Sequence, residues 1–578
     1  MKTRYKLLLM LPLTISFQAG AESVDNYFDN SEPMRYQQNN NLPPEELDNR
    51  FDREPRLYIE AFDTSALNKS AEYGISDEEI FNLIEKDRKS KGNTYTVAHL
   101  NDLMAKLTRY YREHGLLLAQ VYIPQQMIKD NTVVLGFAAG EIGAVNINAN
   151  EFYSSEVVRR PFRNLIGKPV ESSSLEAATM QVRSYPGYQA KTTFSPGEKP
   201  GSTQITVTTL EEDRVAAVFN IDNYGSDYTG KYRTSLTGYI NNPTGNADQL
   251  ILGGFITLNP TNSLYGNILY RLPLMPELAD NDSYMSMFNP LIRNGMVLDA
   301  GYTQNTYSVG QELEELDITG EASTLFAGIT SNLKFTNRQR ITGTVRLNTK
   351  TAKTVQNDNT LAEDKLTTLE LSTAWTFRDY YLSDRPAATS LSFAYYQGLA
   401  GFLGAMSDGD ANSRSNASGD FAPAGFSKFE INMKRQQPID TNEATLALRI
   451  VQTGDMLTPI EQTPIGGPYA VRGYQTGDFN ADSAIILNAE YAGYSNSKLS
   501  LPIDNLKAGL FIDYAAGWRN DALANGSEAA HMLAAGWFAE FIKEKKFNAR
   551  LFMGIPLTQL EPADGSSFQL YFTLQRRF

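Results

Sequence analysis

The sequence predicts a mixed fold, in which two soluble α+β units precede a 16-stranded antiparallel transmembrane β-barrel. Three observations lead to this prediction. The N-terminus has the features of a secretory signal, and residues 56–211 combine helical with strand patterns. After Glu211 the chain consists of runs of about ten residues that alternate apolar and polar side chains. A closed barrel lets such strands cross a membrane without unpaired backbone groups.

The first 21 residues are predicted to form a signal peptide. Residues 2–6 carry three basic side chains, residues 7–17 form an apolar core, and the small residues 19–21 suit cleavage. The apolar core is too short for a membrane-spanning helix. No later run of about 18 apolar residues occurs, so the rest of the chain can insert in a membrane only as a barrel.

The composition argues against several classes of function. The formal net charge is −14, and removal of the basic signal peptide makes it about −17, which disfavours nucleic-acid binding. The chain has no cysteine, which excludes disulfides and thiolate metal sites. His99, His114 and His531 are scattered and lie in no motif of a zinc site or a histidine-dependent hydrolase. The sequence therefore predicts no catalytic residue, no metal site and no cofactor.

The first α+β unit is predicted over residues 56–142. Ser76 and Glu79 have the spacing of a capping box before a first helix. Thr96 suits the N-cap of a second helix. The predicted buried face of that second helix consists of Leu100, Leu103, Met104, Leu107, Tyr110 and Tyr111.

Strands complete the first unit, and a second unit of the same type is predicted over residues 143–211. In the first unit, strands are expected over residues 57–62, 116–123 and 132–137. In the second, the expected elements are a strand over 144–148, a short helix after Ser154, a helix through Leu175, Ala178 and Val182, and strands over 188–194 and 203–210.

The barrel prediction rests on sixteen alternating runs, an even number, as is usual for bacterial barrels. With the α+β units on one side of the membrane, the inserts 400–423, 454–481, 517–528 and 556–566 fall on the opposite side, and 273–294 falls on the same side. The predicted runs are 214–222, 231–241, 248–258, 261–272, 295–306, 323–334, 338–350, 366–378, 386–398, 424–436, 442–453, 482–493, 505–516, 529–541, 546–555 and 567–578.

Two stretches of the barrel region carry residues that suit each other. The insert 454–481 contains an isolated arginine, Arg472, beside glycines and a proline that shape a tight loop. Asp513 lies in an apolar strand, and alternation places it in the lumen because Leu510, Ile512 and Tyr514 share the opposite face. A bidentate guanidinium–carboxylate pair is one interpretation. A solvated arginine and an unrelated aspartate are the other.

The motifs Val471-Arg472-Gly473-Tyr474 and Phe511-x-Asp513-x-x-x-Gly517 resemble the two signature motifs of TpsB-type two-partner secretion transporters, in the superfamily that includes BamA. The resemblance implies that the loop folds back into the barrel and that Arg472 meets Asp513 on the wall. The usual strand motif is Phe-x-Asp-x-Gly, whereas here Ala515 occupies the glycine position. Glu490, predicted to face the lumen from the preceding strand, is a second candidate carboxylate.

Two further motifs resemble those of the same family. Asp222, Asn223, Gly225, Thr229, Gly230 and Arg233 match the hairpin that opens the barrel in these transporters, although such residues are also common in ordinary turns. Tyr122, Pro124 and Gln126 match the Tyr-Ile-Pro-x-Gln motif of the first periplasmic POTRA domain. The C-terminal Phe578 resembles the terminal residue by which the insertion machinery recognises bacterial outer-membrane barrels.

The resemblance implies a function and a location. The expected protein lies in the bacterial outer membrane, with two POTRA domains in the periplasm that capture the secretion domain of a large TpsA-type exoprotein. That partner is an adhesin, a haemolysin or a contact-dependent inhibition toxin. The other expected partners are outer-membrane lipid and the insertion machinery, and a monomer is expected. Residues 22–55 are either a flexible linker or a plug helix followed by a linker. An assembly factor and a passive channel remain the alternative functions.

Overall fold

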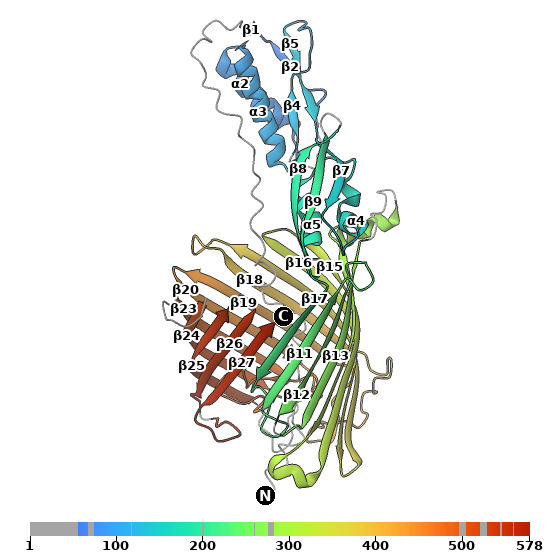
Figure 1. The fold of residues 1–578 in the computed structure, drawn as a ribbon, viewed down its shortest axis with the longest axis vertical. Helices are drawn as coiled ribbons and strands as arrows, with labels where there is room; N and C mark the ends of the chain where they lie inside the picture. Colours follow the sequence, from blue (N-terminus) through green and yellow to red (C-terminus); the bar gives the residue numbers. More distant parts are fainter. Residues whose placement is uncertain are drawn as a thin grey trace. The chain divides into compact units, whose positions relative to one another are not determined.

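The computed structural model describes residues 56–67, 74–116, 118–198, 202–258, 260–275, 283–495, 505–520, 529–543, 546–558 and 560–578. The predicted signal peptide and the segment 22–55 lie outside these residues. The described chain divides into two compact units. One contains the residues up to Glu212 together with 335–337, and the other contains residues 213–334 and 338–578. Figure 1 shows the first unit in blue to green and the second in green to red.

The N-terminal unit begins with an α+β domain whose helices pack on short strand pairs. Its elements are β1 (Leu57–Tyr58), β2 (Ala61–Asp63), α2 (Asp77–Lys91), β3 (Thr94–Tyr95), α3 (Val97–Glu113), β4 (Gln120–Tyr122), β5 (Thr132–Val134) and β6 (Gly136–Ala138). The predicted cap of α3 is confirmed, since the Thr96 hydroxyl accepts the His99 N–H. All six residues of its predicted apolar face are buried.

Two details of this domain were predicted wrongly. The Ser76 side chain makes no capping bond to α2. Instead, Tyr110 of α3 accepts the Ser76 N–H (3.1 Å) and donates to Glu79 (2.8 Å), so a tertiary contact replaces the capping box. The strand predicted over 57–62 is interrupted because the Ile59 and Glu60 N–H groups donate to Asn93 and Asn131, in two different segments.

A buried charge holds α2, β3 and α3 together. The Asp87 carboxylate accepts from the Tyr95 hydroxyl (3.3 Å) and from the Lys106 ammonium (2.8 Å). Burial, with the Asp87 carboxylate beside it, raises the pKa of Tyr95, so the hydroxyl stays protonated and keeps donating.

The second α+β domain follows the predicted order of elements. It contains β7 (Glu141–Asn148), α4 (Ser155–Arg159), the 3₁₀ helix η3 (Arg160–Leu165), α5 (Ser172–Arg183), β8 (Tyr188–Pro196) and β9 (Ser202–Glu212). The strand order is β7-β9-β8, with β7 and β9 parallel. The Ser154 hydroxyl caps α4 by accepting the Val157 N–H. Leu175, Ala178 and Val182 are buried on α5, as predicted.

Among the described residues, sixteen strands close into one antiparallel barrel in chain order (Figure 1). Each overlaps one predicted run, so the predicted fold class is confirmed. The strands are β10 (Val215–Asp222), β11 (Tyr232–Asn241), β12 (Gln249–Leu258), β13 (Ser263–Leu274), β14 (Met296–Ser308), β15 (Ile318–Phe335), β16 (Gln339–Gln356), β17 (Asn359–Asp379), β18 (Ala387–Gly398), β19 (Ser427–Ile439), β20 (Asn442–Thr453), β23 (Ser483–Ser495), β24 (Asn505–Trp518), β25 (Ala529–Lys543), β26 (Phe547–Pro556) and β27 (Gln569–Arg577).

Three strands are longer than predicted by five residues or more. β15, β16 and β17 contain 18, 18 and 21 residues. At the end of the β16–β17 hairpin, every pair from Thr351–Lys365 to Gln356–Asn359 contains at least one polar residue. Apolar alternation indicates only the part of a strand that has one apolar face, so it does not reveal this polar extension.

The barrel has an apolar outer face and a charged inner face. Leu510, Ile512 and Tyr514 are exposed on the outside, whereas Asp513 is 0% exposed. On the inside, many carboxylates pair with a basic side chain on another strand, as in Asp299–Arg346 and Glu443–Lys507. None of the helices in the described part of the chain is long and apolar enough to cross a membrane.

The first and last strands close the barrel. The register between β10 and β27 runs only from Val218–Arg577 to Asp222–Thr573. The terminal Phe578 extends this pairing, because its N–H donates to the Ala217 carbonyl (2.8 Å) and its carbonyl accepts the Ala217 N–H (3.3 Å).

Candidate functional site

The arginine loop (residues 454–481) connects β20 to β23 and folds against the inner wall of the barrel. A short antiparallel pair, β21 (Thr463–Pro464) with β22 (Asn480–Ala481), forms its base. At its tip, the Val471 N–H donates to the Ile465 carbonyl and the Val471 carbonyl accepts from Gly467. Val471 and Tyr474 are fully buried, so the tip is packed rather than solvated.

Arg472 is paired with Asp513 in the structure. Its Nε and Nη2 donate to the two oxygens of the Asp513 carboxylate, each at 2.7 Å, and its backbone N–H donates to the same group at 3.1 Å. The fork-to-carboxylate geometry is the strongest that arginine forms. Arg472 is 5% exposed, so the pair lies out of bulk water. Asn488 also donates to Asp513 (2.8 Å) and to the Ala470 carbonyl (2.6 Å).

Glu490 completes the surroundings of Arg472. It accepts from Arg472 Nη1 and from Arg550 Nη2, the latter at 2.7 Å. The Arg472 guanidinium lies over the Phe511 ring, 3.6 Å from its centroid. Two carboxylates, a second arginine and an aromatic face therefore hold one guanidinium, and the predicted residues of both motifs lie together.

Small residues on the wall make room for the loop. A Cβ at Gly473 would lie 2.7 Å from Ala534 Cβ and 2.9 Å from the Pro556 nitrogen, so only glycine fits there. A Cβ at Gly517 would lie 2.8 Å from Ala481 Cβ. Ala515, at the family's usual glycine position, is fully buried in the same cluster. The variant strand motif thus still presents a small-residue surface to the loop.

The first hairpin closes the barrel near the loop tip. Asp222 accepts from Arg233 Nε (2.7 Å), which fixes the two strand ends to each other. Asn223 bonds across the closure, because its amide donates to the Leu570 carbonyl and its side-chain oxygen accepts the Phe572 N–H, each at 2.8 Å. Thr229 donates its N–H to Ser226 in the turn (3.1 Å).

The glycines of this hairpin lie where a side chain would collide. A Cβ at Gly225 would lie 1.9 Å from the Gly230 carbonyl oxygen. Gly230 has a φ of +103°, which other residues rarely adopt.

The arginine loop bridges the barrel closure. Tyr469 packs edge-on against Tyr224 of the first hairpin, with ring centroids 5.5 Å apart. The Tyr571 hydroxyl of β27 donates to the Tyr474 carbonyl at 2.8 Å. Gln475 donates to Asp227 (2.9 Å) and to Asp564 (2.8 Å), which lie in the loops on either side of the closure. Movement of the loop tip would therefore disturb the contacts that hold β10 beside β27.

Asn223→Ala is expected to weaken the barrel closure. The substitution leaves the Leu570 carbonyl and the Phe572 N–H without their side-chain partner, at about 1–3 kcal/mol for each group that stays unsatisfied. The temperature at which the folded barrel changes to its unfolded gel mobility should fall. Asn359→Ala is the control, because its exposed amide donates only to the nearby Asn357 carbonyl. Equal transition temperatures for the two variants would contradict this role.

Two buried ion-pair groups at the loop base are not predicted by any motif in the sequence. Asp482 is fully buried and binds both Nη atoms of Arg414, at 2.5 and 2.8 Å, from the insert 399–426. Glu461 accepts from Lys350 and Lys428, both at 2.6 Å. These residues are far apart in the sequence and belong to no motif. The only signal that could have suggested them is that the long inserts contain charged side chains.

Glu461→Gln is expected to loosen the arginine loop. The isosteric amide leaves two largely buried lysines without a counter-charge, and breaking a buried pair in this way costs about 3–5 kcal/mol. Backbone hydrogen exchange within residues 454–481 should become faster in the folded protein. Glu321→Gln is the matched control, since this exposed carboxylate binds the neutral Gln304. The same exchange rates in both variants would argue against the expected role.

The Tyr122, Pro124 and Gln126 motif makes local contacts within the first α+β domain. Gln126 accepts the Val134 N–H and donates to the Val134 carbonyl, both at 2.8 Å. It therefore pairs with β5 as a strand residue would. Its amide also contacts the Pro124 carbonyl at 3.3 Å. The Tyr122 ring covers Gly136, where a Cβ would lie 2.7 Å from the ring. Tyr122 remains 44% exposed.

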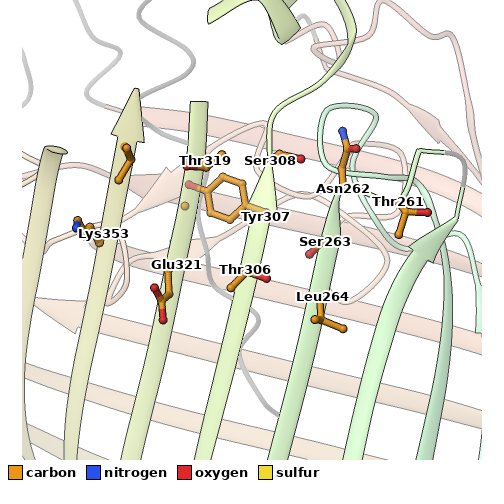
Figure 2. A pocket seen from close by; sticks show the side chains of 12 residues that line it. Thr261, Asn262, Ser263, Leu264, Thr306, Tyr307, Ser308, Thr319, Glu321 and Lys353 are labelled. Carbon is orange, nitrogen blue, oxygen red and sulfur yellow. The ribbon is translucent and has the colours of Figure 1, made fainter. Parts of the chain in front are cut away.

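A hollow at the ends of barrel strands β13 to β16 shares none of its lining residues with this site (Figure 2). Leu264, Thr306 and Glu321 stand in one cross-strand row of β13, β14 and β15 and therefore share a face. Leu264 is 57% exposed on the outer face. Among the described residues, no group of three or more histidines and carboxylates suits a metal ion.

Comparison with known proteins identifies the family. The family model described as "Haemolysin secretion/activation protein ShlB/FhaC/HecB" matches residues 201–539, and the model of the ShlB-type POTRA domain matches residues 78–139. The chain belongs to this haemolysin secretion family. It is an outer-membrane transporter of the two-partner secretion type that exports a partner exoprotein, and its POTRA domains lie in the periplasm.

Individual relatives agree with the family. The heme/hemopexin transporter protein HuxB of Haemophilus influenzae is 22% identical over 74% of this chain and 71% of its own length. The outer membrane transporter CdiB of Escherichia coli is 22% identical over 73% of this chain and 68% of its own length. These relatives favour the secretion function over barrel assembly or a passive channel.

Solved structures agree on the fold. CdiB from Escherichia coli has a TM-score of 0.72 at 18% identity, covering 96% of this chain and 95% of that one. CdiB from Acinetobacter baumannii has a TM-score of 0.63 at 15% identity, covering 91% of this chain and 90% of that one.

Proposed function

We propose that the exoprotein passes through the lumen of this barrel and that the arginine loop must leave its seat for passage. The observation that carries the proposal is the fully paired guanidinium of Arg472, which fixes the tip of the loop to the inner wall through Asp513 and Glu490. The tip of the loop therefore has two defined positions, because the guanidinium is either paired in the dry site or released to water.

The POTRA domains are proposed to capture the secretion domain at the N-terminus of the exoprotein. Exposed strand edges and apolar side chains favour binding of an extended chain, and Tyr122 on β4 (44% exposed) and Val134 on β5 (37% exposed) are two such side chains. The exoprotein is proposed to be an adhesin, a haemolysin or a contact-dependent inhibition toxin. Folding of the exported chain outside the cell would give the transport its direction, and no step requires catalysis by this protein.

Three further elements belong to the proposal. The protein acts as a monomer in the lipid of the outer membrane. Phe578 serves the barrel-insertion machinery as a recognition residue, and it is 64% exposed at the end of β27. Residues 22–55 lie outside the described residues, and their role as linker or plug stays a prediction from the sequence.

The path of the exoprotein can be tested by crosslinking during export. β16 offers a matched pair of neighbours: Thr344 faces the lumen beside Thr330, and Val345 faces outward at 53% exposure. A photoreactive residue at position 344 should crosslink to the exoprotein when export is arrested, and one at position 345 should not. Crosslinks at 345 alone, or at equal yield from both positions, would contradict transport through the lumen.

A further inference from the structure

The insert between β13 and β14 exposes an unusual set of apolar side chains. It contains a 3₁₀ turn, η4 (Tyr284–Phe288), followed directly by the helical turn α6 (Asn289–Ile292). None of these residues is buried. The exposed set consists of Tyr284 (82%), Met285 (45%), Met287 (70%), Phe288 (42%) and Leu291 (43%). In water, such a surface costs free energy, so a partner is expected to cover it.

This insert lies against the outside of the barrel wall. On β15, odd-numbered residues face outward, and Ile329 and Leu333 are 44% and 40% exposed. Ser331, between them on the same face, is only 8% exposed. Its hydroxyl donates to the Leu291 carbonyl, and Asn294 donates to the Leu333 carbonyl at 3.0 Å. The insert therefore covers part of the outward face, and Figure 1 shows its short helix outside the ring of strands.

The insert lies at the level of an aromatic girdle. A Cβ at Gly343 would lie 3.6 Å from the Leu333 side chain, and Gly343 pairs with Thr373 on β17. Trp375 and Phe377 follow Thr373 on the same outward face, with ring centroids 4.4 Å apart. Outward aromatic rings near a barrel rim mark the boundary between hydrocarbon and headgroups. The insert therefore contacts the barrel wall at the height of this boundary, at the end of the barrel that carries the periplasmic turns.

We propose that residues 283–293 are a membrane-interface segment that inserts its tyrosine, methionine and phenylalanine side chains into the periplasmic leaflet of the outer membrane. The segment continues the lipid-facing surface of the barrel, which argues for phospholipid as the occupant. The exposed Arg293 at its end suits a phosphate headgroup. Short amphipathic segments bind to bilayer interfaces in this way, with apolar side chains in the lipid and a basic residue near the headgroups. Insertion of this segment into the leaflet does not depend on the route that the exoprotein takes.

Because the chain has no cysteine, a single label can test the depth of this segment. Met287→Cys carries a nitroxide spin label, and the folded full-length protein is reconstituted in phospholipid nanodiscs. Ile329→Cys is the hydrocarbon reference, and Thr441→Cys, exposed in the β19–β20 hairpin of the same rim, is the aqueous reference. Collisions with a water-soluble nickel complex should be about threefold fewer at 287 than at 441, with oxygen collisions close to those at 329.

Two results would overturn the proposal. Nickel accessibility at 287 equal to that at 441 would place the segment in water. Low accessibility to both oxygen and nickel would show that protein, rather than lipid, covers it. Heat-modifiable gel mobility of each variant establishes that the barrel is folded, so neither result can be attributed to a failure to fold.

Discussion

Arg472→Ala should reduce export of the exoprotein to a small fraction of the normal amount while the barrel still inserts into the outer membrane. The substitution leaves Asp513, which is fully buried, and Glu490 without their shared guanidinium. Removal of one partner from a buried pair costs about 3–5 kcal/mol, which corresponds to a change of about two to four orders of magnitude in the population of the seated loop. Blots of the medium and the cell surface measure the exported protein.

The matched variant is Arg472→Lys, which keeps the charge but cannot form the two-pronged contact to Asp513. It should export less than the wild type and more than Arg472→Ala. Heat-modifiable mobility of the barrel serves as the folding control. Normal surface exoprotein in Arg472→Ala cells would show that the paired arginine is dispensable and would remove the loop from the mechanism.

Deletion of the second POTRA domain should abolish export. The structure sets the cleanest limits at residues 141–212, from the first residue of β7 to the last residue of β9, rather than at the predicted 143–211. The deletion removes a complete three-stranded sheet with its helices, and the barrel strands from β10 onward stay intact. An unaffected yield of exoprotein, with normal barrel mobility, would contradict a role for this domain in capture.

A point variant tests the first POTRA domain without changing the length of the chain between the domains and the barrel. Gln126→Ala removes both contacts to the Val134 backbone in the first POTRA domain without shortening the chain. A deletion that stops export while Gln126→Ala only lowers it would agree with two domains that act together.

The fold was predictable because the barrel strands alternate apolar residues that face outward with polar residues that face the lumen. Leu510, Ile512 and Tyr514 on one face and Asp513 on the other are visible from alternation alone. Alternation fails where both faces are polar, which is why the extended β16–β17 hairpin was predicted too short. The capping box at Ser76 failed because Tyr110, distant in sequence, supplies a competing hydrogen bond.

The candidate site was predictable only as far as its motifs reach. The Arg472 and Asp513 motifs named two partners, and lumenal alternation suggested Glu490. The sequence could not show that Asn223 bonds to β27, because barrel closure brings together residues more than three hundred positions apart. Arg414 with Asp482, and Glu461 with its two lysines, depend on how two long loops pack, and no local pattern records such packing.

The most direct test of the central claim is release of the exoprotein. The chain is expressed together with a candidate TpsA-type exoprotein, and the medium and cell surface are assayed by blot with and without the chain. Two-partner secretion predicts that the exoprotein appears outside only when this chain is present. Equal amounts outside in its absence would contradict the account, and outer-membrane protein levels in the deletion strain would then test the barrel-assembly alternative.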